Sequence, residues 1–118
     1  MERIKQFGKS FSCAIRGLVY ALKNEKNFQN ELIIAVLVVI LMWYFRVTRA
    51  EMVVLVLVIA SVLVLELLNT IMERVVDILK PRIHPYARLI KDLMAAVVLI
   101  SSIFAIIVGL IIFLPYIL

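Results

Sequence analysis

The chain has 118 residues, of which 65% are hydrophobic, and its mean hydropathy is +1.12. These values exclude a soluble globular protein and indicate an integral membrane protein with one domain, residues 1–118. The single cysteine excludes an intramolecular disulfide and a cysteine-based metal site, and three glycines leave no Gly-rich phosphate loop. We attribute the net charge of +5 to basic residues that set the membrane topology and attract anionic lipid. We do not expect nucleic-acid binding.

Residues 1–24 have the pattern of an amphipathic helix. Apolar residues recur at steps of three and four, namely Ile4, Phe7, Phe11, Ile15, Leu18 and Leu22. Basic residues take the other face, namely Lys5, Lys9, Arg16 and Lys23. The pattern predicts a helix that lies in the membrane interface.

Three apolar runs follow and predict an all-α membrane protein with transmembrane helices at about 28–46, 51–72 and 93–115. The first two runs are shorter than the roughly 20 residues that a span needs. Their helices must therefore extend past Glu31 and Glu66, which places these carboxylates at one margin of the membrane. We expect the second helix to continue to about Leu79, and Pro81 and Pro85 to confine irregular backbone to the following loop.

Basic residues set the orientation. They are frequent before the first span and between the second and third, whereas the first loop holds only Arg46 and Arg49. The positive-inside rule then places the N-terminus and the second loop in the cytoplasm, and the C-terminus outside.

The segment after the second apolar run carries a polar stripe. Glu66, Asn69, Glu73 and Asp77 follow steps of three, four and four, which puts them on one face of a helix. Carboxylates on one stripe repel each other, and at the edge of a bilayer they lose the water that would screen them. A bound cation is the natural partner.

Most acidic residues fall in the same cytoplasmic layer, namely Glu25, Glu31, Glu66, Glu73, Asp77 and Asp92. Basic residues share it, namely Lys26, Arg88 and Lys91. Carboxylates hold hard cations such as Mg²⁺, and basic side chains hold phosphate oxygens. Phosphoryl transfer also needs a carboxylate near the acceptor hydroxyl. The layer therefore predicts transfer from a cytoplasmic nucleotide to a lipid hydroxyl.

Other interpretations stay open for single residues. Glu31 and Asp77 are also typical of solvated residues at a span's end, and Asn69 of a hydrogen bond between helices. Lys91 and Asp92 also suit the start of the third helix. For the whole chain, the alternatives are a small cation-coupled transporter, which favours a carboxylate near the bilayer centre, and a non-catalytic membrane subunit.

The same residues carry a family resemblance. The segments in order are Asn24-Glu25-Lys26-Asn27-Phe28, Glu31, Glu66-Leu67-Leu68-Asn69-Thr70, Glu73, Val75-Val76-Asp77, His84-Pro85 and Lys91-Asp92. Together they resemble the small bacterial integral-membrane diacylglycerol kinases and undecaprenol kinases, over nearly the whole chain and with matching spacings.

The resemblance implies a homotrimeric lipid kinase in the bacterial cytoplasmic membrane that uses ATP and Mg²⁺ and shares active sites between neighbouring subunits. It implies that Glu66 is the catalytic base, that Glu25 and Glu73 hold the metal, and that Glu31 supports the site. The residues implied to position nucleotide and phosphate are Lys9, Arg16, Asn69, Asp77, Lys91 and Asp92.

The acceptor lipid has two candidates. The His84-Pro85 segment and the Gly109–Leu114 stretch resemble the undecaprenol kinases more than the diacylglycerol kinases. We therefore favour undecaprenol slightly, with diacylglycerol as the alternative.

Overall fold

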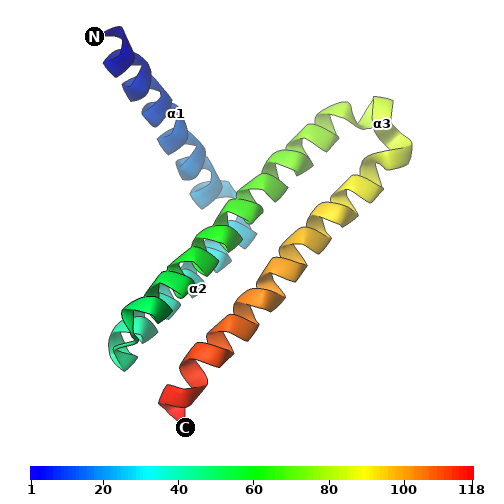
Figure 1. The fold of residues 1–118 in the computed structure, drawn as a ribbon. Helices are drawn as coiled ribbons and strands as arrows, with labels where there is room; N and C mark the ends of the chain where they lie inside the picture. Colours follow the sequence, from blue (N-terminus) through cyan, green and yellow to red (C-terminus); the bar gives the residue numbers. More distant parts are fainter.

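The computed structural model describes the backbone of residues 1–118 and every side chain except that of Ile83. Across this range the backbone forms α1 (Glu2–Asn24), α2 (Lys26–Phe45) and α3 (Arg49–Ile117). Figure 1 shows α3 reversing direction near its middle, so that its second arm returns along its first arm and α2. Helix α1 projects away from this bundle. The predicted all-α class is confirmed.

The reversal in α3 corrects one expectation. Pro81 and Pro85 were expected in irregular backbone, but the structure keeps helical backbone through both residues. Proline lacks an N–H group and cannot bond the carbonyl four residues earlier. Two prolines four residues apart therefore weaken successive turns, which allows a sharp bend without a loop. The two arms of α3 are Arg49–Arg82 and His84–Ile117.

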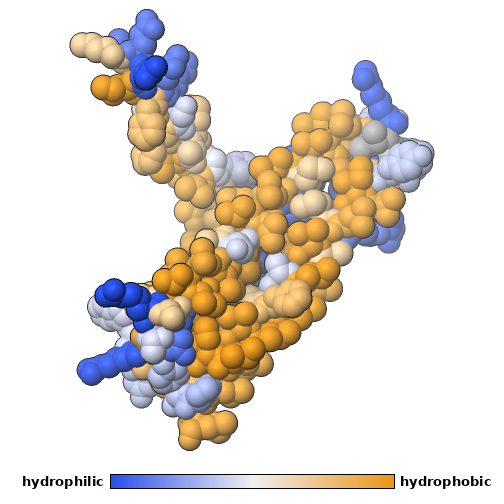
Figure 2. Space-filling model, viewed as in Figure 1, coloured by the Kyte–Doolittle hydropathy of each residue, from blue (hydrophilic) through white to orange (hydrophobic). Residues whose placement is uncertain are grey.

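Membrane spanning follows from length and composition. Within the described part of the chain, three segments are long and apolar enough to cross a bilayer: α2 and the two arms of α3. Figure 2 shows a hydrophobic surface over the middle of the bundle, with hydrophilic side chains gathered towards its ends. This distribution is the one that a bilayer core and its two interfaces require.

The junction of α1 and α2 consists of Glu25, whose extended backbone interrupts the helix. Ala21 of α1 and Phe28 of α2 are buried on either side of it. Further along α1, Ile4, Phe7 and Phe11 leave their side chains exposed. An exposed apolar face beside a basic one suits a helix in the membrane interface.

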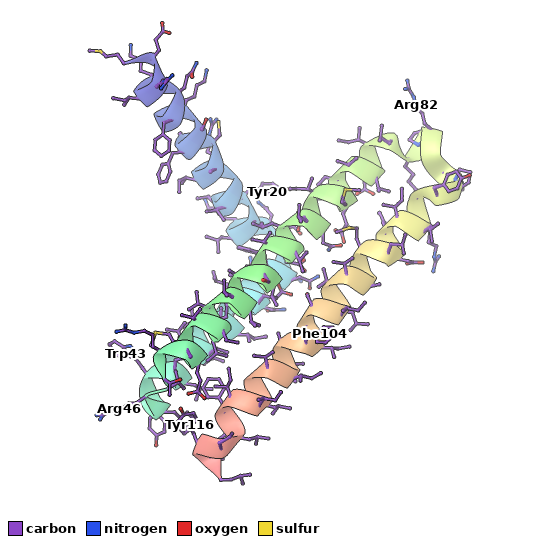
Figure 3. The ribbon with its side chains drawn as sticks, in the orientation of Figure 1. Tyr20, Trp43, Arg46, Arg82, Phe104 and Tyr116 are labelled. Atoms are coloured by element: carbon purple, nitrogen blue, oxygen red, sulfur yellow. The ribbon has the colours of Figure 1, made fainter. Side chains whose placement is uncertain are left out.

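The turn end of the bundle comprises Phe45–Arg49 and Phe113–Tyr116. Arg46 ends α2 in the left-handed conformation, and Thr48 caps α3. Glu51 donates its N–H to Thr48 Oγ1 at 3.2 Å and accepts from the Thr48 N–H at 2.9 Å. Glu51 also accepts a hydrogen bond from the Tyr116 hydroxyl, which ties the second arm of α3 to the turn. Figure 3 places Arg46 and Tyr116 at this end and Arg82 at the bend.

A tightly packed cluster lies beside the turn end. Its buried members are Met42, Val47, Leu55, Ile112 and Phe113. In a bilayer the lipid tails are as apolar as these side chains, so close packing rather than water exclusion holds the helices together here. The cluster fixes the two arms of α3 against α2 at one end of the bundle. The polar stripe lies further along the bundle.

Candidate functional site

Glu66 is the most deeply buried acidic residue among those that the structure describes, with 2% of its surface exposed. It lies on the first arm of α3, where the apolar run ends, and Asn69 and Thr70 are buried on the next turn. Thr70 donates its hydroxyl to the Glu66 carbonyl at 3.1 Å, so its own polar group is satisfied within the helix. Glu66 Oε2 accepts no hydrogen bond from any described group. A buried carboxylate oxygen without a donor is costly, which marks Glu66 as a functional candidate.

A cavity of about 360 Å³ lies against the Glu66 side chain. All three membrane segments contribute to its wall: α2 gives Asn27, Asn30 and Glu31, and the second arm of α3 gives Ala95, Val98, Leu99 and Ser102. Oε2 of Glu31 is also buried without a hydrogen-bond partner among the described groups. Two acidic residues from different helices thus line one cavity.

A second cavity, of about 310 Å³, continues from the first towards the turn end. Glu31 and Ser102 belong to the walls of both cavities. The rest of its wall is almost entirely apolar, with Ile34, Val38, Val62 and Ala105 among its residues. The cavity against Glu66 therefore lies next to an apolar one, an arrangement that suits a ligand with a polar group at the end of a hydrocarbon chain.

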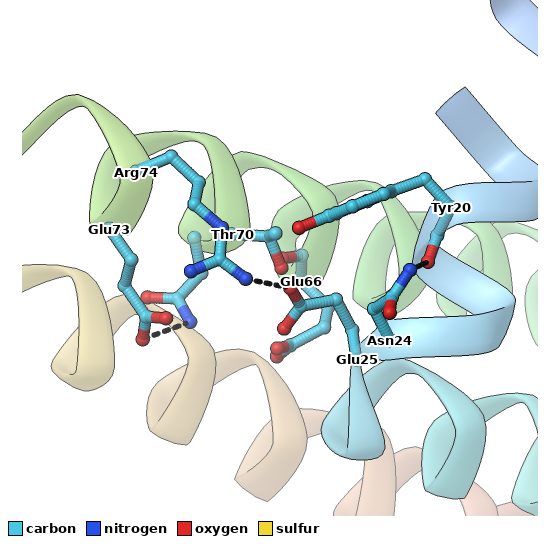
Figure 4. A network of polar contacts seen from close by, with 8 residues as sticks. Tyr20, Asn24, Glu25, Glu66, Thr70, Glu73 and Arg74 are labelled. Atoms are coloured by element: carbon cyan, nitrogen blue, oxygen red, sulfur yellow. Dashed lines mark hydrogen bonds and ion pairs between the residues drawn. The ribbon is translucent and has the colours of Figure 1, made fainter. Parts of the chain in front are cut away.

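Glu25, Glu66 and Glu73 form a carboxylate cluster (Figure 4). The negative charges of Glu25 and Glu73 both act on the Glu66 carboxylate, because like charges at short range repel. Asn69 donates a hydrogen bond from Nδ2 to Glu73 Oε1 at 3.3 Å, which orients Glu73 from the preceding turn of the same helix. The structure therefore gathers three residues that the sequence predicted for one site.

Arg74 joins this cluster from α3. Its guanidinium donates to Glu25 Oε1 at 2.8 Å, across 49 residues of sequence. The Glu25 side chain is 16% exposed and the Arg74 side chain 54% exposed, so the pair lies at the rim of the site. Tyr20 of α1 extends towards the same guanidinium (Figure 4). One cation thus links the α1–α2 junction to α3.

Asp77 and Lys91 form an ion pair of 2.7 Å between the two arms of α3. Both side chains are about half-exposed, and the neighbouring Asp92 is exposed. Lys91 and Asp77 were both predicted to position phosphate, and they do lie together. Their ion pair also connects the two arms of α3 near the bend. Because the pair is solvated, it stabilises the arrangement of the arms only slightly.

Lys9 and Arg16 lie elsewhere. Both are exposed on α1, which leaves the bundle in Figure 1. Arg16 donates to Cys13 Sγ at 3.3 Å on the same helix. Within a single chain, neither residue is brought to the carboxylate cluster by a contact that the structure describes.

The donor set for a metal is small. Among the described residues, no three His, Cys, Asp or Glu side chains gather closely enough to form a complete metal site. Mg²⁺, however, is commonly held by one or two carboxylates together with phosphate oxygens and water. Glu25 and Glu73 each use one carboxylate oxygen, Oε1, in a hydrogen bond. Their chemistry fits a Mg²⁺ ion that arrives with a nucleotide.

Sequence reasoning missed Arg74, Asn27, Asn30 and Ser102. Arg74 was used only as one of the basic residues that predict the membrane orientation, although it directly follows Glu73 in the sequence. Asn27 and Asn30 precede Glu31 by four residues and by one residue, and their own spacing of three places them on one side of α2. Ser102 lies in a long apolar run and gives no sequence signal beyond its polarity.

Comparison with known proteins places this geometry in a family. The family model for prokaryotic diacylglycerol kinase matches residues 12–113. The chain is 36% identical to the undecaprenol kinase of Bacillus subtilis over 114 residues, which cover 97% of this chain and 93% of that protein. It is 36% identical to a diacylglycerol kinase of Synechocystis over 85% of this chain, a match that spans 58% of the longer relative. It is 33% identical to a diacylglycerol kinase of Haemophilus influenzae over 75% of each chain.

Both the coverage and the identity are high enough to assign the family. The matched region includes the carboxylate cluster, both cavities, the first two membrane segments and most of the third. The family and the relatives are named as lipid kinases, which indicates that phosphorylation of a lipid is their shared activity. This chain belongs to the prokaryotic diacylglycerol kinase family and is a bacterial membrane lipid kinase, either an undecaprenol kinase or a diacylglycerol kinase.

Proposed function

We propose that residues 1–118 form one lipid kinase domain that transfers the γ-phosphate of ATP, with Mg²⁺, to a lipid hydroxyl at the cytoplasmic face. The observation that carries this proposal is Glu66, a buried carboxylate whose Oε2 lacks a donor and which faces a cavity between the spans. A lipid hydroxyl that enters beside the Glu66 carboxylate would supply the missing hydrogen bond. The proton that it donates is the one that phosphoryl transfer must remove.

The reaction assigns a role to Glu66. The lipid hydroxyl oxygen forms a bond to the γ-phosphorus, the bond from that phosphorus to the β–γ bridging oxygen breaks, and ADP leaves. Glu66 accepts the hydroxyl proton as general base. Glu31, whose carboxylate lines the same cavity from α2, supports the acceptor hydroxyl on its other side.

Glu25 and Glu73 are the residues that would hold Mg²⁺. When bound, the metal neutralises charge on the nucleotide phosphates. Asn69 orients Glu73 through its hydrogen bond, and the Asp77–Lys91 pair presents an ammonium group near the bend. Asp92, Lys9 and Arg16 complete the set of residues that we propose for nucleotide binding.

Undecaprenol is the acceptor that we favour. The Bacillus subtilis relative that is named undecaprenol kinase aligns with 97% of this chain and over 93% of its own length. The apolar cavity beside Glu31 accommodates part of a hydrocarbon chain while the hydroxyl points to Glu66. Diacylglycerol remains the second candidate because two further relatives carry the name diacylglycerol kinase. A cation-coupled transporter has no such support.

We further propose a homotrimer with its N-terminus in the cytoplasm and its C-terminus outside. The distribution of Lys and Arg supports the orientation. Lys9, Arg16 and Asp92 support shared sites, because all three are exposed, and a neighbouring copy would bring them to a cluster that a single chain leaves without them. Mixing two inactive variants, Glu66→Gln and Asp92→Asn, tests sharing. Recovered turnover supports it, and persistent inactivity contradicts it.

The acceptor is tested by phosphate transfer from γ-labelled ATP in detergent micelles that contain either undecaprenol or diacylglycerol. We expect transfer that requires Mg²⁺ and is faster to undecaprenol. Loss of all transfer after chelation, and its return with Mg²⁺, would support the metal assignment. Faster transfer to diacylglycerol would reverse the choice of acceptor, and transfer to neither lipid would refute the proposed reaction.

A further inference from the structure

Arg74 is the one strongly basic side chain that contacts the carboxylate cluster, within the part of the chain that the structure describes. Its guanidinium lies 2.8 Å from Glu25 Oε1 and extends from the helical turn that carries Glu73. Figure 4 shows Arg74 above the space between Glu25 and Glu73. The family's lipid chemistry requires three phosphates of a nucleotide to enter a region that carries three carboxylates. A cation on that path is needed to offset the charge.

The contact between Arg74 and Glu25 is exchangeable. The Arg74 side chain is 54% exposed, and solvated ion pairs of this kind contribute little to stability. Guanidinium groups bind phosphate oxygens with two parallel hydrogen bonds, a stronger arrangement than a single contact to a carboxylate. Replacing one anionic partner by another therefore costs little and gains a bidentate contact.

We propose that Arg74 is a phosphate-binding residue that leaves Glu25 for the nucleotide phosphates when MgATP enters. The inference rests on the proposed function, in which Glu25 turns to the metal. If Glu25 holds the metal, a nucleotide phosphate drawn to it would come within reach of the Arg74 guanidinium, which already touches this carboxylate. Arg74 thus holds Glu25 in place before binding and takes the phosphate afterwards.

The test compares nucleotide binding without any lipid acceptor. Equilibrium dialysis with labelled ATP and Mg²⁺ in micelles measures affinity for wild type, Arg74→Ala, Arg74→Lys and Arg82→Ala. Arg82 is the matched control, since it lies on the same helix, carries the same charge and is exposed at the bend (Figure 3). We expect the dissociation constant to rise about tenfold in Arg74→Ala, the effect of losing one charged hydrogen-bond pair.

Arg74→Lys keeps the charge without the fork and should lose about threefold. Arg82→Ala should bind as wild type. Turnover assays should show the same change in KM for ATP, with KM for the lipid unchanged. Wild-type affinity in Arg74→Ala would overturn the proposal, and so would an equal loss in Arg82→Ala, which would indicate a general charge effect. Absence of ATP binding or phosphate transfer by the wild type would instead refute the proposed function itself.

Discussion

The turn end and the carboxylate cluster both contain glutamate carboxylates, but the carboxylates at the two places differ in their hydrogen-bond partners. At the turn end, Glu51 has partners in the Thr48 N–H and the Tyr116 hydroxyl, beside a packed apolar cluster. At the cluster, the Glu66 carboxylate retains a buried oxygen without a donor among the described groups, and so does that of Glu31, which lines the same cavity as Glu66. The cavity against Glu66 also replaces packing there. One end therefore contributes stability, and the other holds polar groups ready for a ligand.

The largest expected effect comes from making the same Glu→Gln substitution in each of the two regions and comparing the results. Glu66→Gln should lower turnover at least about 100-fold, because the general base is lost, while Mg²⁺-dependent ATP binding is retained. Glu51→Gln makes the same change at the turn end and should leave turnover at the wild-type level. Lipid phosphorylation and ATP dialysis measure both variants. Equal turnover in the two variants would remove the distinction between the regions.

Glu73→Gln addresses the nucleotide side of the cluster. Loss of a carboxylate that holds the metal should raise KM for MgATP about tenfold, with a smaller change in KM for the lipid. The measurement is turnover at varied ATP with saturating acceptor. If KM for ATP stays at its wild-type value, Glu73 does not hold the metal.

Ser102 tests whether the shared wall of the two cavities binds the acceptor. Ser102→Leu fills space between the polar and apolar cavities and should raise KM for the lipid about threefold, with KM for ATP unchanged. Ser101→Leu is the control, because Ser101 is absent from both cavity walls among the described residues. Equal responses of the two variants would show that the effect reflects packing of the helix.

The smallest effect belongs to the turn end. Thr48→Ala removes the side chain that caps α3 and should lower the free energy of unfolding by about 1 kcal/mol. Turnover at low temperature should stay unchanged, because the cap lies far from Glu66 along the bundle. Denaturant-induced unfolding in mixed micelles measures the first quantity. A loss of turnover without a loss of stability would contradict a purely structural role for this end.

Much of the architecture could be predicted because helical periodicity and apolar run length are local properties. The three segments able to span a bilayer and the exposed amphipathic face of α1 follow from them. Helical backbone through Pro81 and Pro85 was not predicted, since a proline pattern does not distinguish a bent helix from a loop. The capping box of Thr48 and Glu51 was visible as a Thr-x-x-Glu spacing but was not recognised.

The candidate site also has features that the sequence could predict and features that it could not. Glu66, Asn69 and Glu73 lie on one helical face, so their proximity follows from spacing alone. The contact of Arg74 with Glu25 joins residues 49 positions apart and depends on how α1, α2 and α3 meet. The cavity wall at Ser102 likewise depends on which face the second arm of α3 turns towards α2. Such pairings require tertiary structure.

The most direct measurement follows thermal stability and phosphate transfer together in one preparation of Glu66→Gln. A buried carboxylate without a donor costs stability, and an uncharged amide costs less. The account predicts that the thermal midpoint equals or exceeds that of the wild type, while transfer from ATP to undecaprenol is lost. A fall in the midpoint with retained transfer would show that Glu66 is a structural residue and would contradict its role as the base.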